Sequence, residues 1–281
     1  MKKEIIIAKN SGFCFGVKRA VDMTANHENI KGKTYTLGPL IHNRDVINRL
    51  NEQGIKTMEN EEIDSLNTED TIVIRSHGVG PKIIQGIEKS GANVIDATCP
   101  FVSNIHKIVK KHYDLGYQII IVGDKKHPEV IGINGWCDNT AIITKDGSDL
   151  DNLSSKVCIV AQTTERLINY EKVVDIVSKK SEELVMFNTI CNATKVRQES
   201  AYELSKIVDL MIVIGGKNSS NSKKLFEICG ANCKNTLFIE NSDELPKELI
   251  EDEKIKKIGI TAGASTPDWV IEGVINKIKN G

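Results

Sequence analysis

Short β-branched runs alternate with stretches of helical periodicity along nearly all of the 281-residue chain. The runs include EIIIAK, TIVIRS, NVIDAT, QIIIVG, VCIVAQ, LMIVIGG and KIGITAG, and VSNIHKIVKKHYDLG is one of the helical stretches between them. Strands that alternate with helices favour an α/β fold with mainly parallel sheets, because parallel strands need a crossover connection. The sequence has no low-complexity segment and no linker rich in Pro, Gly or Ser. We therefore expect a chain that is compact throughout.

One plan of cysteine, glycine and polar residues repeats three times along the sequence. In each repeat a cysteine follows a strand-like run and precedes a helix-like one: Cys14, Cys99 and Cys191, which lie 85 and 92 residues apart. A glycine ends the next strand-like run twenty-four residues later: Gly38, Gly123 and Gly215. A polar residue stands four residues further on: His42, His127 and Ser219. The third strand of each repeat closes on Ser76-His77, Gln162-Thr163-Thr164 or Ala264-Ser265-Thr266.

This repeat predicts three similar α/β lobes. We expect the first to cover residues 1–97 with Cys14, the second 98–189 with Cys99 and the third 190–281 with Cys191. In parallel α/β units, ligands bind beyond the carboxyl ends of the strands, where helix N-termini offer free N–H groups and a positive dipole end. Lobes around a pseudo-threefold axis would therefore bring the three cysteines and the polar residues to one central cavity.

Three thiolates from three lobes could bind zinc or an iron–sulfur cluster. Structural zinc sites usually have paired, closely spaced ligands, which the wide spacing of these cysteines does not match. A cuboidal 4Fe–4S cluster normally takes four cysteines, so three cysteines would leave one iron open. An open iron can act as a Lewis acid toward a substrate oxygen.

The other four cysteines do not share this register. Cys158, within VCIVA, and Cys137, beside Trp136, are expected to be buried as small apolar residues. Cys229 and Cys233 in CGANC could form a local thiol pair, but their spacing is a weak metal signal and burial is the favoured interpretation. We therefore expect a role in metal binding only for the three cysteines of the repeat.

Hydrogen-bond donors follow the same strands as the three cysteines. They are His42, His77, His127, Thr163, Thr164, Ser219, Ser220, Asn221 and Ser265. Such a set suits an anionic phosphate group that meets helix N-termini. The sequence contains no Gly-x-x-x-x-Gly-Lys motif, which disfavours nucleotide hydrolysis.

Glu129 is the carboxylate closest in sequence to the predicted cavity residues of the middle repeat, in His127-Pro128-Glu129. A glutamate in the first turn of a helix often only stabilises the helix dipole. In a secluded site it can instead donate a proton, and its neighbours favour that role.

The charge balance favours a small-molecule partner. Lys+Arg number 37 and Asp+Glu 38, so the chain has no basic excess for nucleic acid or an anionic membrane. The apolar run in MKKEIIIAKNSGF is shorter than a signal segment, and no stretch approaches the ~20 apolar residues that span a bilayer. Seven cysteines are too few for a disulfide scaffold and odd in number, so we expect a cytoplasmic location.

These motifs resemble the family of 4-hydroxy-3-methylbut-2-enyl diphosphate reductases over nearly the whole chain. The matching segments are GFCFGV at 12–17, GPLIHN at 38–43, RSHG at 75–78, DATCP at 96–100, HPE at 127–129, AQTT at 161–164, NTICNAT at 188–194, NSSNS at 218–222 and GASTP at 263–267. So many matches in one order are highly specific.

The resemblance implies a trilobed protein with one central 4Fe–4S cluster on Cys14, Cys99 and Cys191. It further implies that His42, His77, Ser219, Ser220, Asn221 and Ser265 hold the diphosphate, helped by His127, and that Thr163 and Glu129 face the substrate hydroxyl. The implied reaction reduces the allylic diphosphate, the last step of the methylerythritol phosphate route to isoprenoids, and gives isopentenyl and dimethylallyl diphosphates. The electron donor would be a ferredoxin or a flavodoxin.

Two other functions remain open from the residues alone. A hydro-lyase could use an open cluster iron for dehydration without net electron flow, and only a reductase would need added reductant. A non-catalytic iron–sulfur sensor would leave the ring of His, Ser, Asn and Thr donors unexplained. Binding of a diphosphate would separate a sensor from an enzyme.

Overall fold

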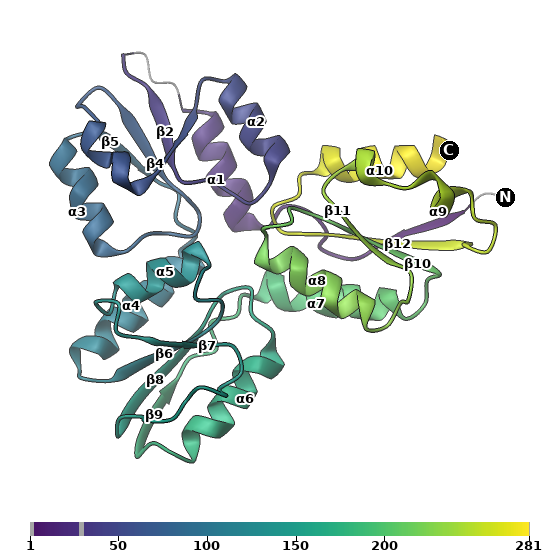
Figure 1. The fold of residues 1–281 in the computed structure, drawn as a ribbon. Coiled ribbons are helices and arrows are strands. Elements are labelled where there is room, and N and C mark those ends of the chain that lie inside the picture. Colours follow the sequence, from purple (N-terminus) through teal and green to yellow (C-terminus); the bar gives the residue numbers. More distant parts are fainter. Residues whose placement is uncertain (1–2, 28–30, 281) are drawn as a thin grey trace. The chain divides into compact units, whose positions relative to one another are not determined.

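The computed structural model describes residues 3–27 and 31–280. Two compact units make up the chain: unit 1 consists of Met1–Val17, Ile41–Asn48 and Asn192–Gly281, and unit 2 of Lys18–Leu40 and Arg49–Cys191. The described strands form three sheets of four strands each, with every neighbouring pair parallel. Each sheet has its own covering helices (Figure 1). The predicted fold class of three α/β lobes with parallel sheets is confirmed.

The sheet of the first lobe lies in unit 2 and has the strand order β3-β2-β4-β5. Its strands are β2 (Thr34–Leu37), β3 (Lys56–Met58), β4 (Thr71–Ile74) and β5 (Asn93–Asp96). Helix α3 (Pro81–Ser90) contributes Ile87 to a core with Leu37 and Ile72. The other helices in this part of the sequence are α1 (Phe15–Ala25), α2 (Arg44–Glu52) and the 3-10 helix η1 (Asn60–Ser65).

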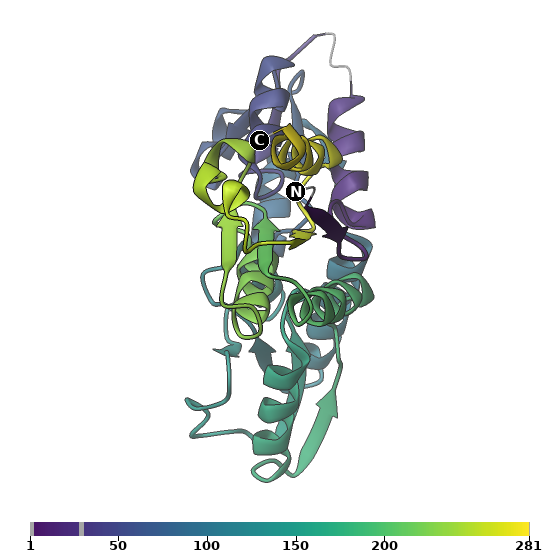
Figure 2. The same cartoon turned by 90° about the vertical axis from the view of Figure 1, so that its right-hand side faces the viewer.

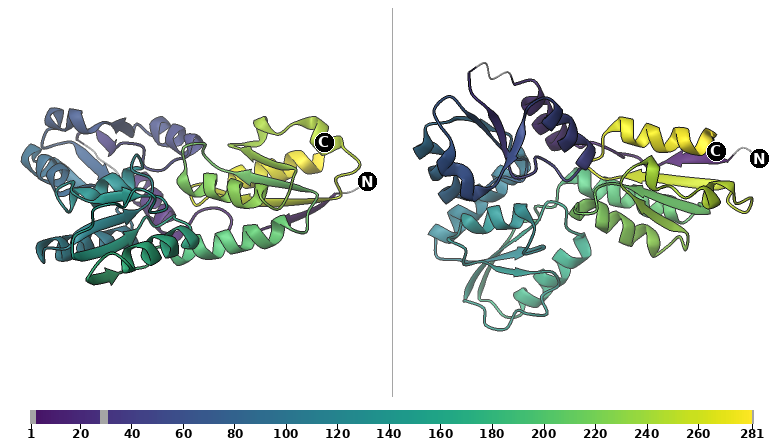
Figure 3. Two further views of the ribbon diagram at one scale, coloured as in Figure 1. Left: turned by 60° about the horizontal axis from the view of Figure 1, so that its bottom comes forward. Right: turned by 45° about the horizontal axis from the view of Figure 1, so that its top comes forward.

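The sheet of the second lobe also lies in unit 2, in the order β7-β6-β8-β9. Its elements are α4 (Pro100–Asp114), β6 (Gln118–Val122), α5 (Pro128–Gly135), β7 (Ile142–Thr144), β8 (Lys156–Ala161), α6 (Leu167–Ser178) and β9 (Glu183–Met186). Alternate residues of β6 enter opposite cores: Ile119 and Ile121 pack with α4 and α5, while Ile120 and Val122 pack with α6. Helices therefore cover both faces of this sheet (Figure 3). Burial on both faces explains the continuous apolar run QIIIV.

The sheet of the third lobe lies in unit 1, in the order β1-β12-β10-β11. Its elements are β1 (Glu4–Ile7), α7 (Asn192–Ser205), β10 (Leu210–Ile214), α8 (Ser220–Gly230), β11 (Thr236–Ile239), the 3-10 helix η2 (Ser242–Glu244), α9 (Lys247–Glu251), β12 (Lys257–Ala262) and α10 (Asp268–Asn280). Leu204 and Leu225, from α7 and α8, pack on one face, and Val274 of α10 packs on the other (Figure 2).

The repeat seen in the sequence corresponds to equivalent strand positions in the three sheets. β2, β6 and β10 each have a short partner on one side and β4, β8 or β12 on the other. The fourth position is filled by β5, β9 and β1. The lobe limits expected from the sequence remain predictions, with one correction: β1, inside the range 1–97, pairs with β12 and completes the third sheet. The first strand of the chain thus supplies the edge that residues 190–281 lack.

The two lobes of unit 2 meet along a seam of glycines. A side-chain carbon on Gly135 of α5 would lie 2.8 Å from the Cα of Gly80, so only glycine allows this approach of the two backbones. Trp136 closes the seam, because its indole Nε1 donates to the carbonyl of Val79 at 3.1 Å. Gly80 follows His77 by three residues, and Gly135 ends α5, the helix that His127 caps, so the seam fixes the His77 turn relative to α5.

None of the helices among the described residues is long and apolar enough to cross a membrane.

Candidate functional site

Cys14, Cys99 and Cys191 have equivalent backbone environments. Each follows the fourth strand of a sheet, and each directly precedes the first residue of a helix: Phe15 of α1, Pro100 of α4 and Asn192 of α7. Each cysteine N–H donates to a carbonyl two residues beyond the adjacent strand: Ala264 at 3.2 Å, Ser76 at 3.0 Å and Thr163 at 3.1 Å. Three lobes therefore present a thiol in one and the same local geometry.

Exposure separates these three cysteines from the other four. Cys14, Cys99 and Cys191 are partly exposed, whereas Cys137, Cys158, Cys229 and Cys233 are buried. Burial raises the pKa of the Cys158 thiol to about 12 and that of Cys137 to about 11. Metal binding requires a thiolate, which a helix N-terminus favours and burial in apolar surroundings disfavours. The three cysteines of the repeat therefore suit a metal cofactor, and the expected burial of Cys137 and Cys158 is confirmed.

Glu129 and Thr163 form a buried pair in the second lobe. Glu129 is 3% exposed, in the first turn of α5, and Thr163 is 7% exposed, two residues after β8. The Thr163 N–H donates to Glu129 Oε1 at 2.6 Å, and the Thr163 hydroxyl donates to Oε2 at 2.7 Å. The Thr163 carbonyl also accepts the N–H of Cys191 at 3.1 Å. One residue thus connects the buried acid with a predicted metal ligand.

His127 caps helix α5 and has its tautomer set by that cap. Its Nδ1 accepts the N–H of Glu129 at 3.1 Å, so the proton of a neutral ring is on Nε2. The ring of His77 lies against it edge to face, with centroids 5.2 Å apart and an interplanar angle of 85°. Both side chains belong to unit 2. The cap uses the acceptor of His127 and leaves its donor for other groups.

His106 of α4 supports the turn that carries His77. Its ring is 6% exposed, stacks on Trp136 with centroids 5.2 Å apart, and lies against Gly78. Burial lowers its pKa to about 4, with a smaller opposing effect from Asp96, so the imidazole is neutral near pH 7.

The first turn of α8 in unit 1 carries buried polar groups that no described protein group satisfies. Asn221 is 3% exposed, and both its Oδ1 and its Nδ2 lack a hydrogen-bond partner among the described residues, as does the Oγ of Ser222. Ser219 caps the helix by accepting the N–H of Ser222 at 3.3 Å. An unpartnered buried amide is costly, so a bound polar ligand is the physical explanation that this turn calls for.

His42 and Ser265 come together in the same unit. The Ser265 hydroxyl donates to the carbonyl of His42 at 3.3 Å. Ser220 is the first residue of α8 and is half-buried. Asn43 rather than His42 caps α2, because Asn43 Oδ1 accepts the N–H of Val46 at 3.1 Å.

The predicted site residues therefore form two groups. Unit 1 contains Cys14, His42, Ser219, Ser220, Asn221 and Ser265, and unit 2 contains His77, Cys99, His127, Glu129, Thr163 and Cys191. Sequence reasoning missed Gln162, which is fully buried and accepts the N–H of Asp124 at 3.1 Å while its amide donates to Thr164 at 3.0 Å. Gln162 orders the turn that holds Thr163. Its position directly before Thr163 was the feature of the sequence that could have predicted this role.

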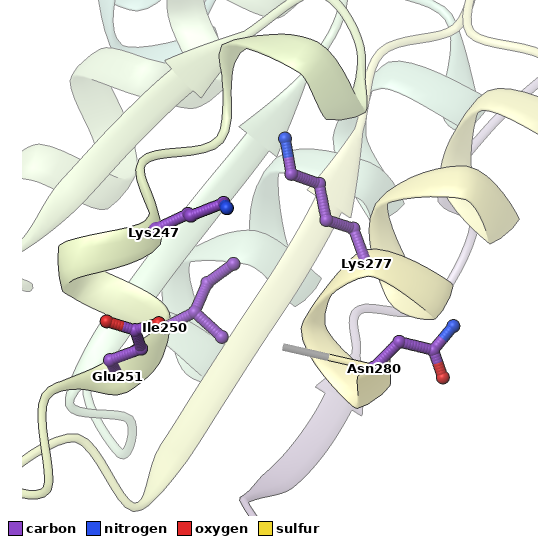
Figure 4. A pocket seen from close by; sticks show the side chains of 5 residues that line it. All are labelled: Lys247, Ile250, Glu251, Lys277 and Asn280. Carbon is purple, nitrogen blue, oxygen red and sulfur yellow. The ribbon is translucent and has the colours of Figure 1, made fainter.

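A pocket of about 270 Å³ in the third lobe carries none of the predicted residues. It is lined by Lys247, Ile250, Glu251, Lys277 and Asn280, and Lys277 donates to the carbonyl of Ser242 at 2.7 Å (Figure 4). Its wall consists of side chains of α9 and α10, among them the buried Ile250, without a buried unpartnered polar atom among the described residues. It gives no indication of a ligand.

The sequence of this chain matches the model of one known protein family. The model described as LytB protein matches residues 5–279. The chain belongs to the LytB family. The predicted family and the predicted class of enzyme, an oxidoreductase, are confirmed, and a metal cofactor is consistent with the family.

Curated relatives in this family bear the name 4-hydroxy-3-methylbut-2-enyl diphosphate reductase. One from Clostridium perfringens (strain 13 / Type A) is 56% identical over 280 residues, which cover 99% of this chain and 99% of the relative. One from Caldanaerobacter subterraneus subsp. tengcongensis is 50% identical over 281 residues, which cover 99% of this chain and 97% of the relative.

Two solved structures are similar over the whole chain. One is (E)-4-hydroxy-3-methyl-but-2-enyl diphosphate reductase, described as the terminal enzyme of the non-mevalonate pathway, with 43% identity, a TM-score of 0.72, and coverage of 99% of this chain and 100% of its own. The other is the E-1-hydroxy-2-methyl-but-2-enyl-4-diphosphate reductase of Plasmodium falciparum, with 27% identity, a TM-score of 0.90, and coverage of 98% of this chain and 88% of its own.

Proposed function

We propose that this chain reduces (E)-4-hydroxy-3-methylbut-2-enyl diphosphate to isopentenyl diphosphate and dimethylallyl diphosphate. Each turnover consumes two electrons and two protons, replaces the C–O bond by a C–H bond and releases one water. The names of full-length relatives support this substrate. The observation that carries the proposal is the buried Glu129–Thr163 pair, because a leaving hydroxyl needs a proton from a group that is screened from water.

One 4Fe–4S cluster on Cys14, Cys99 and Cys191 is the proposed cofactor. When bound, such a cluster supplies electrons singly and offers one iron without a cysteine, which acts as a Lewis acid. The equivalent helix-start geometry and partial exposure of the three thiols support this ligand set. A ferredoxin or a flavodoxin is the proposed electron donor, and a cytoplasmic location remains a prediction.

The proposed proton route begins at Glu129. In the structure the Thr163 hydroxyl donates to Glu129 Oε2 at 2.7 Å. In the proposed step this hydroxyl turns to the leaving oxygen of the substrate, passes its proton to it and recovers one from the Glu129 carboxyl in its acid form. Protonation of the allyl fragment at either end then gives the two products. His127 orients the site, because its Nδ1 caps α5 and thereby makes Nε2 the donor of the neutral ring.

The diphosphate-binding role is proposed for donors that stand at helix starts and strand ends. These are His42, His77, Ser219, Ser220, Asn221 and Ser265, with help from His127. The unpartnered amide of Asn221 supports this assignment, because a phosphate oxygen would satisfy its Nδ2. N–H groups at the start of α8 would add to the attraction.

Anaerobic purification with iron and sulfide analysis tests the cofactor, and substrate consumption with and without reductant tests the reaction. We expect about four irons per chain and turnover only with reductant. Cys14→Ser, Cys99→Ser and Cys191→Ser should each impair the cluster, whereas Cys158→Ser, in the core beside β6, should keep it. Unchanged iron content in the first three variants would refute the ligand set, and turnover without reductant would indicate a hydro-lyase.

A further inference from the structure

The turn that leads into Cys14 has a strained backbone. It comprises residues 8–14, between β1 and α1, and is named the Cys14 turn. Asn10 has φ 56° and Gly12 has φ 93°, both in the left-handed region. Such conformations persist only where surrounding groups determine them. Some part of unit 1 must therefore hold this turn in place.

Helix α7 supplies that hold through two side chains. Arg197 is 2% exposed, and its Nη2 donates to the carbonyl of Gly12 at 2.8 Å, while its Nη1 donates to the carbonyl of Ala193 at 3.3 Å. Ser200 Oγ accepts the N–H of Lys9 at 2.7 Å. The contacts reach both ends of the turn, and Gly12 is two residues before the thiol.

A buried arginine needs a physical reason, because removing a guanidinium from water is costly. Its planar guanidinium holds its N–H donors in a rigid fork, so it bonds two acceptors in fixed directions, whereas the donors of a lysine ammonium rotate about one point. In this chain one acceptor belongs to the Cys14 turn and the other to the first turn of α7, the helix that begins directly after Cys191. The guanidinium therefore connects the turn that carries Cys14 to α7, the helix that follows Cys191.

We propose that Arg197 is a positioning residue for the cofactor, which holds Cys14 in its ligand geometry through the carbonyl of Gly12. The proposal rests on the function and the cluster proposed above. Groups that orient metal ligands without touching the metal typically change metal affinity 10–100-fold when replaced. Arg197 acts in the same way, through the backbone that carries the ligand.

Arg197→Met tests this assignment, because methionine keeps much of the side-chain volume and removes both bonds. We expect faster hydrogen exchange at the Cys14 N–H, which is bonded to Ala264, and release of iron to a chelator roughly 10–100-fold faster than from the wild type. Exchange around Cys99, which lies in unit 2, is the internal reference and should not change. Wild-type exchange and iron release in Arg197→Met would overturn the proposal.

Two controls on the same helix separate positioning from general stability and charge. Leu204→Ala truncates a core residue and should lower the thermal midpoint without accelerating exchange at Cys14. Lys195→Met removes an exposed cation and should leave exchange and iron release at wild-type values. If Leu204→Ala accelerates both as much as Arg197→Met does, Arg197 has only a structural role.

Arg197→Lys is the gentler variant and carries the test if Arg197→Met does not fold. It keeps the charge but has no fork, so exchange at Cys14 and iron release should remain faster than in the wild type. Wild-type values for Arg197→Lys would show that the charge alone matters and would overturn the proposal. A wild-type chain purified without iron would refute the proposed cofactor, and exchange at Cys14 would still test the hold of Arg197 on the turn.

Discussion

Two equivalent turns, one in the second lobe and one in the third, have the same backbone plan and the same kind of helix cap. They differ in whether their buried polar side chains have hydrogen-bond partners in the protein. His127 follows β6 as Ser219 follows β10, and each caps the next helix through a side-chain acceptor. Glu129 and Asn221 stand two residues further on, in the first turns of α5 and α8. The scaffold therefore places an acid and an amide at matching positions.

The two side chains differ in their protein partners. Both carboxylate oxygens of Glu129 are bonded to Thr163, whereas neither amide atom of Asn221 has a partner among the described residues. The counterpart of Thr163 beyond β12 is Ala264, which accepts from a cysteine N–H in the same way but has no hydroxyl. A turn that satisfies its own acid can hold and transfer a proton, while a turn with a free amide requires a ligand.

Replacing the acid should have the largest effect on activity. Glu129→Gln keeps the shape, and its amide can still bond to Thr163, so iron content and substrate binding should be normal. Turnover with a strong artificial reductant should fall roughly 10²–10⁴-fold, the usual loss of general acid–base assistance.

A second buried acid provides the matched control for Glu129. Glu165 is 2% exposed and accepts the N–H of Arg166 and the amide of Asn169, both on its own segment. Glu165→Gln should therefore keep wild-type turnover. Near-normal turnover in Glu129→Gln with a full cluster would show that Glu129 only stabilises the dipole of α5. The two turns would then not differ in proton transfer.

Acid should destabilise the second lobe before the third, because His106 of α4 is buried there as a neutral imidazole. Its folded pKa of about 4 lies below the ordinary value of 6.5, so the unfolded chain binds the proton more readily. The stability that this group contributes is present above pH 6.5 and is lost as the pH falls toward 4, by about 3 kcal/mol in total. Urea unfolding of the iron-free chain between pH 7 and pH 4 measures the loss.

His106→Phe is the control for this pH dependence. Phenylalanine keeps the stack on Trp136 and cannot titrate, so the difference in unfolding free energy between the two chains should depend on pH with the sign just given. Parallel curves for the two chains would mean that folding does not change the pKa of His106.

The strands and the repeat were predictable because they depend on local patterns. Runs such as QIIIV and LMIVI became central strands. The place of β1 was not predictable, because pairing with β12 joins residues more than 250 positions apart.

The candidate site was predictable in its residue types and not in its contacts. Spacing identified Glu129 and Thr163 separately, but the two bonds between them depend on how α5 packs beside β8. Arg197 gave no signal, because an arginine inside a helical stretch is usually exposed and its burial depends on the Cys14 turn.

Removing the free amide should weaken binding without weakening the fold. Asn221→Ala deletes a group that has no protein partner, so the unfolding free energy should change little. Diphosphate binding should weaken by about 1–3 kcal/mol, the cost of leaving a buried charged group short of one hydrogen bond. Calorimetric titration with the substrate, beside a thermal unfolding curve, measures both. A destabilised chain with unchanged substrate affinity would place Asn221 in the fold and not in the site.

The smallest expected effect comes from replacing Ser219, which caps α8 as His127 caps α5. Ser219 Oγ accepts the N–H of Ser222, as Nδ1 of His127 accepts the N–H of Glu129, and the cap leaves the hydroxyl proton of Ser219 for a ligand. Ser219→Ala removes acceptor and donor, and should cost about 1 kcal/mol of stability, whereas Ser219→Gly should cost only a few tenths because glycine is tolerated at a cap. If the hydroxyl also donates to the diphosphate, both variants should lose the same binding energy despite their different stabilities. Substrate affinity that instead follows stability, weaker in Ser219→Ala than in Ser219→Gly, would show that Ser219 acts only as a cap.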